Sequence, residues 1–145
     1  MTVARPILVF VDSDVIISSL ISKSGAAYTL LHNTKQIELY VSNFSILELE
    51  QVSKRLGIEV ELLNIVIAKR LNSVKVDSSY AKVQREFADY VRDPHDAHIV
   101  AGAKEAKAAF LVSYNIRHFV PEKLREDFQL ILLTPGLFLQ YLRSL

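Results

Sequence analysis

Short runs of β-branched residues and leucine alternate along this chain with longer stretches of helical periodicity, and this alternation limits the fold more than any other feature. The runs lie at 7–11, 38–42, 110–113 and 130–134, with a weaker one at 74–76. Each run has the length of a strand and is apolar enough to be buried on both faces. Strands that alternate with helices favour a parallel sheet covered by helices. We therefore expect an α/β fold.

The stretches between these runs have the spacing of helices. Residues 43–56 have apolar side chains three and four apart and end before Gly57, which is typical of a helix C-cap. Residues 58–71 are so broadly apolar that this helix is either buried on most sides or packed on another chain. A third apolar stripe spans 80–91, and Pro94 begins a fourth, alanine-rich helix, since proline is tolerated in the first helical turn.

The composition is that of one ordinary globular domain over residues 1–145. Half of the residues are hydrophobic and 23% are charged, and there is no repeat or Pro/Gly/Ser-rich linker. The absence of cysteine excludes disulfides, thiolate zinc sites, iron–sulfur clusters and cysteine nucleophiles. It fits a reducing compartment, so we expect a cytoplasmic protein.

Charge and hydropathy name no partner by themselves. The formal net charge is +1, which favours neither nucleic acid nor an acidic ligand. Asp12 interrupts the apolar run near the N-terminus, so this stretch is expected to be a first buried strand rather than a signal peptide. No 18-residue apolar segment follows, and we expect no membrane span.

Two acidic residues follow the first predicted strand. Asp12 either forms a turn, reaches solvent at the edge of the sheet or meets a cation, because a lone buried carboxylate is costly. Asp14 is expected to cap a helix that begins near Val15. The pair also resembles the opening of haloacid-dehalogenase-type phosphatases, in which the first Asp would be a nucleophile and the second a general acid.

Further acids lie in the helical stretches. Glu48 and Glu50 flank the apolar stripe of 43–56 on its two sides, and periodicity does not choose between them. In the segment 92–98, Asp93 is a candidate helix cap and Asp96 lies near the positive end of the helix dipole. His95 is expected at the surface, whereas His98 is expected to be packed or to face substrate.

The acids become informative together, because this topology can bring them to one edge of the sheet. The set is Asp12, Glu48, Asp93 and Asp96. Two like charges 4 Å apart repel by about 4 kcal/mol at an effective dielectric of about 20. Such a pocket must therefore hold divalent cations or protonated carboxylates. An all-oxygen site favours Mg²⁺ or Mn²⁺.

Four segments of the chain resemble the PIN-domain family, and in particular the small PIN proteins that are toxins of toxin–antitoxin pairs. They are VFVDSDVIIS, SNFSILELEQV, RDPHDAHIVAGAKEAKAAFLVS and YNIRHF. The similarity runs in register from Ile7 to about Thr134. The order and spacing of the four segments are more specific than any one of them.

The resemblance implies a three-layer α/β/α fold with a mostly parallel central sheet and a metal-dependent endoribonuclease. It assigns catalysis and the binding of Mg²⁺ or Mn²⁺ to the acids Asp12, Glu48, Asp93 and Asp96, and it prefers Glu48 to Glu50. Two departures from the family pattern concern secondary metal ligands. Asn115 stands where many members have a further acid, and Asp14 adds an acid where Asn is common.

The resemblance also implies partners. Arg92, Arg117 and Tyr114 are predicted to bind single-stranded RNA, although each is also explained as a solvated cation or a core aromatic; the same holds for Lys23, Lys104, His118 and Phe119. An antitoxin would block the acidic pocket, and the 58–71 helix is a candidate homodimer surface. The alternatives are a non-catalytic PIN-like scaffold and a haloacid-dehalogenase-type phosphatase. Against the phosphatase, this chain lacks the Lys and Gly-Asp motifs that such enzymes have after later strands.

Overall fold

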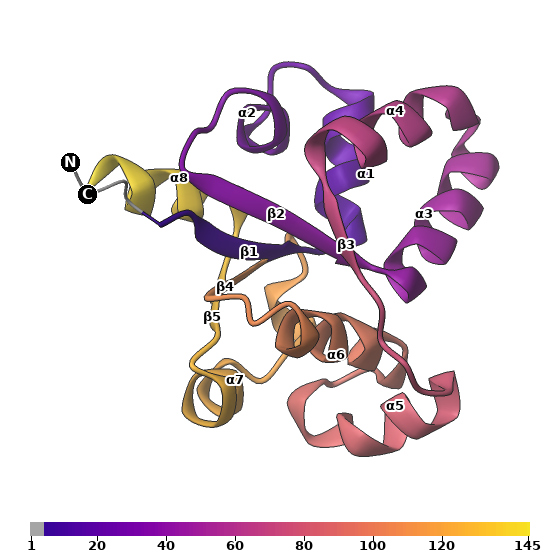
Figure 1. The fold of residues 1–145 in the computed structure, drawn as a ribbon, viewed down its shortest axis with the longest axis vertical. Helices are drawn as coiled ribbons and strands as arrows, with labels where there is room; N and C mark the ends of the chain where they lie inside the picture. Colours follow the sequence, from indigo (N-terminus) through magenta and orange to yellow (C-terminus); the bar gives the residue numbers. More distant parts are fainter. Residues whose placement is uncertain (1–4) are drawn as a thin grey trace.

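A five-stranded parallel sheet runs through the computed structural model, which describes residues 5–145 (Figure 1). The strand order is β3-β2-β1-β4-β5, and every neighbouring pair is parallel. The strands are β1 (Ile7–Val11), β2 (Ile37–Ser42), β3 (Asn72–Val74), β4 (Phe110–Val112) and β5 (Ile131–Leu133). All five predicted strands are present, although β3 begins two residues before its predicted start. The first four residues of the predicted N-terminal stretch lie outside the described part of the chain.

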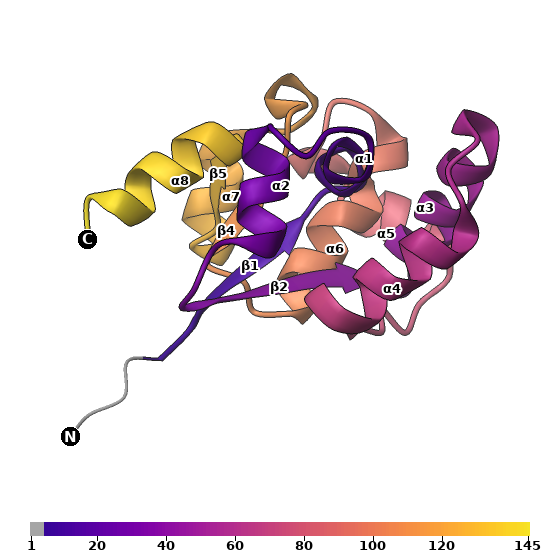
Figure 2. The same cartoon turned by 90° about the horizontal axis from the view of Figure 1, so that it is seen from above.

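Helices cover both faces of the sheet and complete the predicted three-layer α/β/α arrangement (Figures 1 and 2). One face carries α1 (Ser13–Ile21), α2 (Ala26–His32), α3 (Asn43–Leu56), α4 (Val60–Arg70) and α8 (Pro135–Arg143). The other carries α5 (Tyr80–Glu86), α6 (Ala97–Glu105) and α7 (Pro121–Phe128). Short 3-10 turns span Ala88–Tyr90, Pro94–Asp96 and Ile116–His118.

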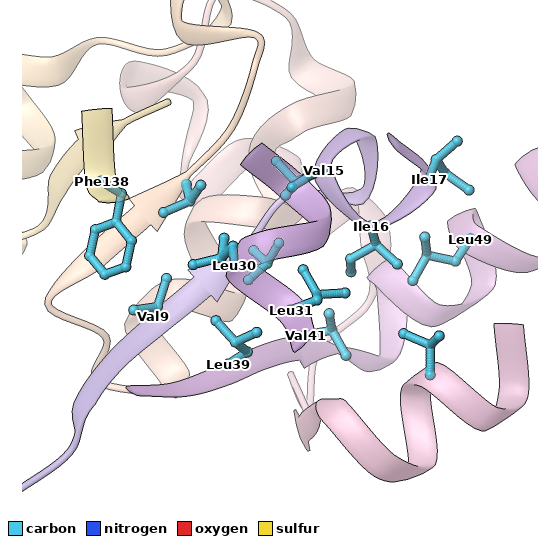
Figure 3. Close-up of a cluster of buried hydrophobic side chains, with 14 of the residues drawn as sticks. Val9, Val15, Ile16, Ile17, Leu30, Leu31, Leu39, Val41, Leu49 and Phe138 are labelled. Carbon is cyan, nitrogen blue, oxygen red and sulfur yellow. The ribbon is translucent and has the colours of Figure 1, made fainter. Parts of the chain in front are cut away.

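Alternate residues of β1 point into two separate cores. Val9 contributes to the core that contains Leu30 and Leu49 of the helices above it (Figure 3). Phe10 points to the opposite face and is fully buried. A Cβ atom at Gly102 would lie 2.5 Å from Cζ of Phe10. The missing side chain at Gly102 therefore lets α6 pack closely on the sheet.

Local signals explain where α3 begins and ends. The hydroxyl of Ser42 accepts a hydrogen bond from the backbone N–H of Ser45 at 3.1 Å, as an N-cap does. Gly57 follows the helix with a φ of 72°, which favours glycine. Both boundaries of this helix were predicted from the sequence. The predicted alanine-rich helix is also confirmed, with Pro94 at the start of a 3-10 turn that leads into α6.

Helix α4 is exposed along much of its length. Leu63 and Val66 are buried, but Val60, Leu62 and Ile65 are each more than 40% exposed. Of the two alternatives predicted for this helix, burial on most sides is wrong, because α4 lies at the edge of its layer and packs mainly on α3. Packing on another chain stays a prediction. Within residues 5–145, no helix is long and apolar enough to cross a membrane.

Candidate active site

Asp12 lies at the carboxyl end of the central strand, where parallel α/β sheets bind ligands. It is 6% exposed and is the N-cap of α1, with Oδ1 accepting a hydrogen bond from the backbone N–H of Ser13 at 2.7 Å. Its Oδ2 accepts a hydrogen bond of 2.7 Å from the hydroxyl of Ser113, which follows the neighbouring strand β4. The cap of α1 is thus Asp12, and the prediction that Asp14 caps this helix is wrong.

Asp14 lies two residues after Asp12, in the first turn of α1, and belongs to the same site. Its Oδ2 accepts a hydrogen bond from the backbone N–H of Tyr114 at 3.0 Å. Its Oδ1 is buried and has no hydrogen-bond partner. Burial raises the pKa of Asp14 to about 6, although backbone hydrogen bonds, the first of them from Tyr114, act against this shift. With a pKa of about 6, a substantial fraction of this carboxyl group is still protonated at the lower end of the physiological pH range.

Glu48 reaches the site from the second turn of α3. It is half-buried, and its Oε2 lies 3.2 Å from Nε2 of the buried His98 on α6. Burial by itself would raise the pKa of Glu48, but the hydrogen bonds with His98 and Ser13 and the charges of His98 and His95 together outweigh it, and the pKa is lowered. Glu50, its competitor in the sequence, is exposed. Leu49 is fully buried in the core between them.

Asp96 and Asp93 differ in their surroundings. The Oδ2 of Asp96 lies 3.0 Å from Nδ1 of His118, and the carboxylate is largely buried. Asp93 is exposed, and its Oδ1 accepts a hydrogen bond from the backbone N–H of His95 at 3.0 Å. The predicted capping role of Asp93 is confirmed.

One cavity of about 480 Å³ brings four of these carboxylates together. Its lining includes Asp12, Asp14, Glu48, Asp96 and Asn115, together with His118. Ile17 and Ile21 of α1 and Val52 of α3 add apolar surface to the same lining. Asp93 is not among the residues that line this cavity.

The carboxylates of the cavity interact unfavourably with one another. Burial raises the pKa of Asp12 well above its usual range, and the nearby charge of Asp14 raises it further. The pKa of Asp96 is also raised, first by burial, while the pairing with His118 lowers it and the charge of Asp93 raises it. Within residues 5–145, none of the four carboxylates forms an ion pair with Lys or Arg.

The donor atoms of this cavity fit a hard divalent cation. Carboxylate oxygens and an amide oxygen are what Mg²⁺ and Mn²⁺ prefer. The Oδ1 atom of Asp14 is buried and has no hydrogen-bond partner. A bound cation would supply the partner that this oxygen lacks. In the described part of the chain, no three His, Asp or Glu side chains form a group that could hold a metal ion as they stand. Glu48 and Asp96 are directed instead toward their histidine partners.

The predicted RNA-binding residues lie at the surface near the cavity rather than in its lining. Arg92, Tyr114 and Arg117 are exposed. The backbone N–H of Arg92 donates to the carbonyl of His118 at 2.8 Å, so the two arginines lie on adjacent segments. Phe119 is 1% exposed and belongs to the core, which excludes it from stacking on bases.

Two contacts of the site were not predicted from the sequence. Ser113 joins the ends of β1 and β4, because its hydroxyl donates to Asp12 and accepts from the backbone N–H of Asn115 at 2.9 Å. His118 lines the cavity beside Asp96. The position of Ser113 at the carboxyl end of a predicted strand was the signal that pointed to it. The pairing of His118 depends on the loop after β4 and left no local signal.

Comparison with known proteins identifies the family. The sequence profile of the PIN domain matches residues 8–117. The chain belongs to the PIN domain family, which confirms the resemblance drawn from its four segments. The match favours this family over haloacid-dehalogenase-type phosphatases. No curated protein matches the sequence.

A solved structure shows the same fold. The chain is similar to one in the crystal structure of VapBC2 from Rickettsia felis bound to a DNA fragment from their promoter. The TM-score is 0.62 at 20% identity, and the alignment covers 88% of this chain and 98% of that chain. At this identity the similarity concerns the fold.

Proposed function

We propose that this protein is a divalent-metal-dependent endoribonuclease that cleaves phosphodiester bonds of single-stranded RNA. The observation that carries this proposal is the gathering of Asp12, Asp14, Glu48 and Asp96 around one cavity, where no Lys or Arg of residues 5–145 forms an ion pair with them. Membership of the PIN domain family supports it.

In this proposal Asp12, Glu48 and Asp96 hold Mg²⁺ or Mn²⁺. Asp14 and Asn115 are secondary ligands, and Asp93 contributes negative charge from its position near Asp96. When bound, a divalent ion supplies positive charge against the phosphodiester and lowers the pKa of an attacking water. Asn115 orients water through its amide and adds no charge.

The chain's own groups then handle the proton and the substrate. Asp14 is well placed to accept a proton, because it lines the cavity and its buried Oδ1 has no hydrogen-bond partner. Glu48 and Asp96 are the alternatives for this role. Arg92 and Arg117 bind phosphates of the strand, and the exposed ring of Tyr114 stacks on a base.

The similarity to a VapBC2 structure supports a second level of the proposal, in which the protein is the cytoplasmic toxin of a toxin–antitoxin pair. An antitoxin segment would place a basic side chain among the carboxylates and apolar side chains against Ile17, Ile21 and Val52. The exposed apolar residues of α4 remain a proposed homodimer surface. A constant monomeric mass in light scattering across protein concentrations would contradict the dimer.

The test is cleavage of a labelled single-stranded RNA in Mn²⁺ or Mg²⁺, with a chelator control. Glu48→Gln and Glu50→Gln form a matched pair on one helix, because only Glu48 lines the cavity. We expect Glu48→Gln to reduce cleavage by at least about 100-fold. Glu50→Gln should leave it unchanged, and Asp96→Asn should abolish it.

Three results would count against the proposal. Cleavage that persists in chelator would exclude the metal, and equal losses in Glu48→Gln and Glu50→Gln would exclude this cavity. A chain that binds Mn²⁺ but cuts no RNA from a transcriptome-wide pool would favour the non-catalytic scaffold, for which the amide at Asn115 is the specific observation.

A further inference from the structure

A second cavity of about 440 Å³ adjoins the acidic cavity. Glu48 lines both of them, so the two cavities share this side chain as a wall. The second cavity lies between α3, the start of α5 and the start of α6, which supply Phe44, Tyr80 and His98. Its volume falls within the range of about 300–1,000 Å³ that is typical of small-ligand sites.

Three aromatic rings form the body of this second cavity. The ring centroid of Phe44 lies 5.7 Å from that of Tyr80 and 6.1 Å from that of His98. The rings of Tyr80 and His98 are 6.2 Å apart. His98 is buried, whereas Tyr80 is 38% exposed, so one ring of the cluster is open to solvent. The cluster is therefore a rigid aromatic platform with an accessible edge.

The chemistry of the lining selects a planar, uncharged ligand. Glu48 is the carboxylate of the lining, and no Lys or Arg is part of it. A phosphate would meet this carboxylate and no Lys or Arg of the lining. Polar groups that can bond to the edge of a ring are present, since the Tyr80 hydroxyl lies 3.2 Å from Nδ1 of His95 at the cavity. Aromatic faces with a few polar groups are typical of nucleobase sites.

The acidic charges lie close to this platform. Glu48, Asp93 and Asp96 all raise the pKa of Tyr80, after the larger effect of burial. The phenol ring thus lies within electrostatic reach of the carboxylates that are proposed to surround the scissile phosphodiester. Because Glu48 lines both cavities, the nucleotide next to a phosphate bound in the acidic cavity would be within reach of this ring.

We propose that the cavity formed by Phe44, Tyr80 and His98 binds one nucleobase of the RNA strand, next to the phosphodiester that is cleaved. This inference rests on the proposed ribonuclease function and adds a base-binding site to it. Tyr80 provides the stacking surface, and Phe44 and His98 hold its ring in place. Because every base has an aromatic face, the site positions the strand without requiring one particular base.

The test compares two labelled strands of equal length and charge. One is single-stranded decaadenylate, and the other is an abasic decamer of ribose phosphate. Binding is measured by fluorescence anisotropy in Mn²⁺ with the Asp96→Asn chain, so that the strand stays intact. Tyr80→Ala, Tyr80→Phe and Tyr141→Ala are made in the same chain. Tyr141 is the matched control, because it is also 38% exposed but lies on α8.

We expect Tyr80→Ala to weaken the binding of decaadenylate by about tenfold and to leave the abasic decamer unchanged. Tyr80→Phe keeps the ring, so decaadenylate should bind as before, and Tyr141→Ala should change neither strand. Tyr80→Leu retains apolar volume without an aromatic face. It should reproduce the loss if Tyr80→Ala does not fold, which circular dichroism would reveal.

The outcomes separate this inference from the proposed function. If the parent chain cleaves RNA but Tyr80→Ala binds decaadenylate as Tyr141→Ala does, the base site is wrong and the nuclease stands. The same holds if Tyr80→Ala weakens both strands equally. A cavity that receives a side chain of a partner protein would also leave both RNA affinities unchanged. If the parent chain neither binds nor cuts RNA, both proposals fall.

Discussion

Phe10 and Asp12 lie two residues apart on the same central strand, yet they sit in opposite kinds of surroundings. Phe10 is fully buried in a close-packed layer between the sheet and α6. Asp12 is also buried, and its pKa is raised by that burial and then by the charges of the neighbouring carboxylates. Burial of Phe10 thus stabilises the folded state, whereas burial of the charged form of Asp12 destabilises it. The contrast indicates that a stable sheet supports a pocket of mutually repelling charges at its carboxyl edge.

The largest effect on stability is expected from removing the Phe10 side chain between the sheet and α6. Phe10→Ala should lower the free energy of unfolding by about 3–5 kcal/mol, because it removes apolar contacts and leaves a cavity against Gly102. Urea denaturation followed by circular dichroism measures this change. A loss below about 1 kcal/mol would show that the layer collapses around the smaller side chain.

At the acidic edge of the sheet, a substitution that removes charge should raise the free energy of unfolding rather than lower it. The pKa of Asp14 is raised from 3.8 to about 6, so the folded state binds its proton more tightly than the unfolded state does. Its contribution to stability is present below about pH 4 and is lost as the pH rises toward about 6. Without metal, Asp14→Asn should therefore stabilise the protein at pH 7.5, by at most about 3 kcal/mol.

The pH dependence of this gain provides its control. At pH 4 the difference between the Asp14→Asn variant and the parent chain should nearly vanish, because Asp14 is then protonated in the folded state. Saturating Mn²⁺ should stabilise the parent more than the variant, because bound metal favours the charged carboxylate. An equal gain at pH 4 and pH 7.5 would show that charge is not its cause.

A smaller effect on stability is expected at Gly102, where α6 packs most closely on Phe10 of the sheet. In Gly102→Ala the new Cβ would lie 2.5 Å from the Phe10 ring and 3.1 Å from Cβ of Ser42. The resulting overpacking should lower the free energy of unfolding by about 1–2 kcal/mol after the gain of about 1 kcal/mol in helix propensity. Thermal and urea denaturation measure it. A stabilised variant would mean that the ring moves aside freely.

The smallest effect is expected at the exposed end of the acidic set. Asp93→Asn keeps an oxygen that can cap the turn at His95, whereas Asp93→Ala removes it. The alanine variant should lose about 1 kcal/mol of stability. If capping is the main role of Asp93, Asp93→Asn should retain most RNA cleavage while Asp96→Asn does not. Loss of cleavage in Asp93→Asn at unchanged stability would place this carboxylate in the catalytic set.

Local patterns were sufficient for most of the architecture. The central strand Ile7–Val11 and the helix Asn43–Leu56 have the predicted boundaries. They could be predicted because short apolar runs, the apolar spacing within 43–56 and the glycine at position 57 act over a few residues. The exposure of α4 could not be predicted in this way. Hydrophobic content along a helix does not say how many of its sides find a neighbour.

The chain by itself determined which acids were candidates and which edge of the sheet they would reach, because strand ends and helix starts are set by nearby residues. Helical periodicity left Glu48 and Glu50 open, and only the family resemblance preferred Glu48. The tertiary structure places Glu48 in the cavity with Asp12, because this side of α3 meets α6 through His98. It also decided that Asp12 bonds to Ser113, a contact between residues 101 positions apart. Such pairings are made by packing between distant segments, and no local pattern in the sequence records them.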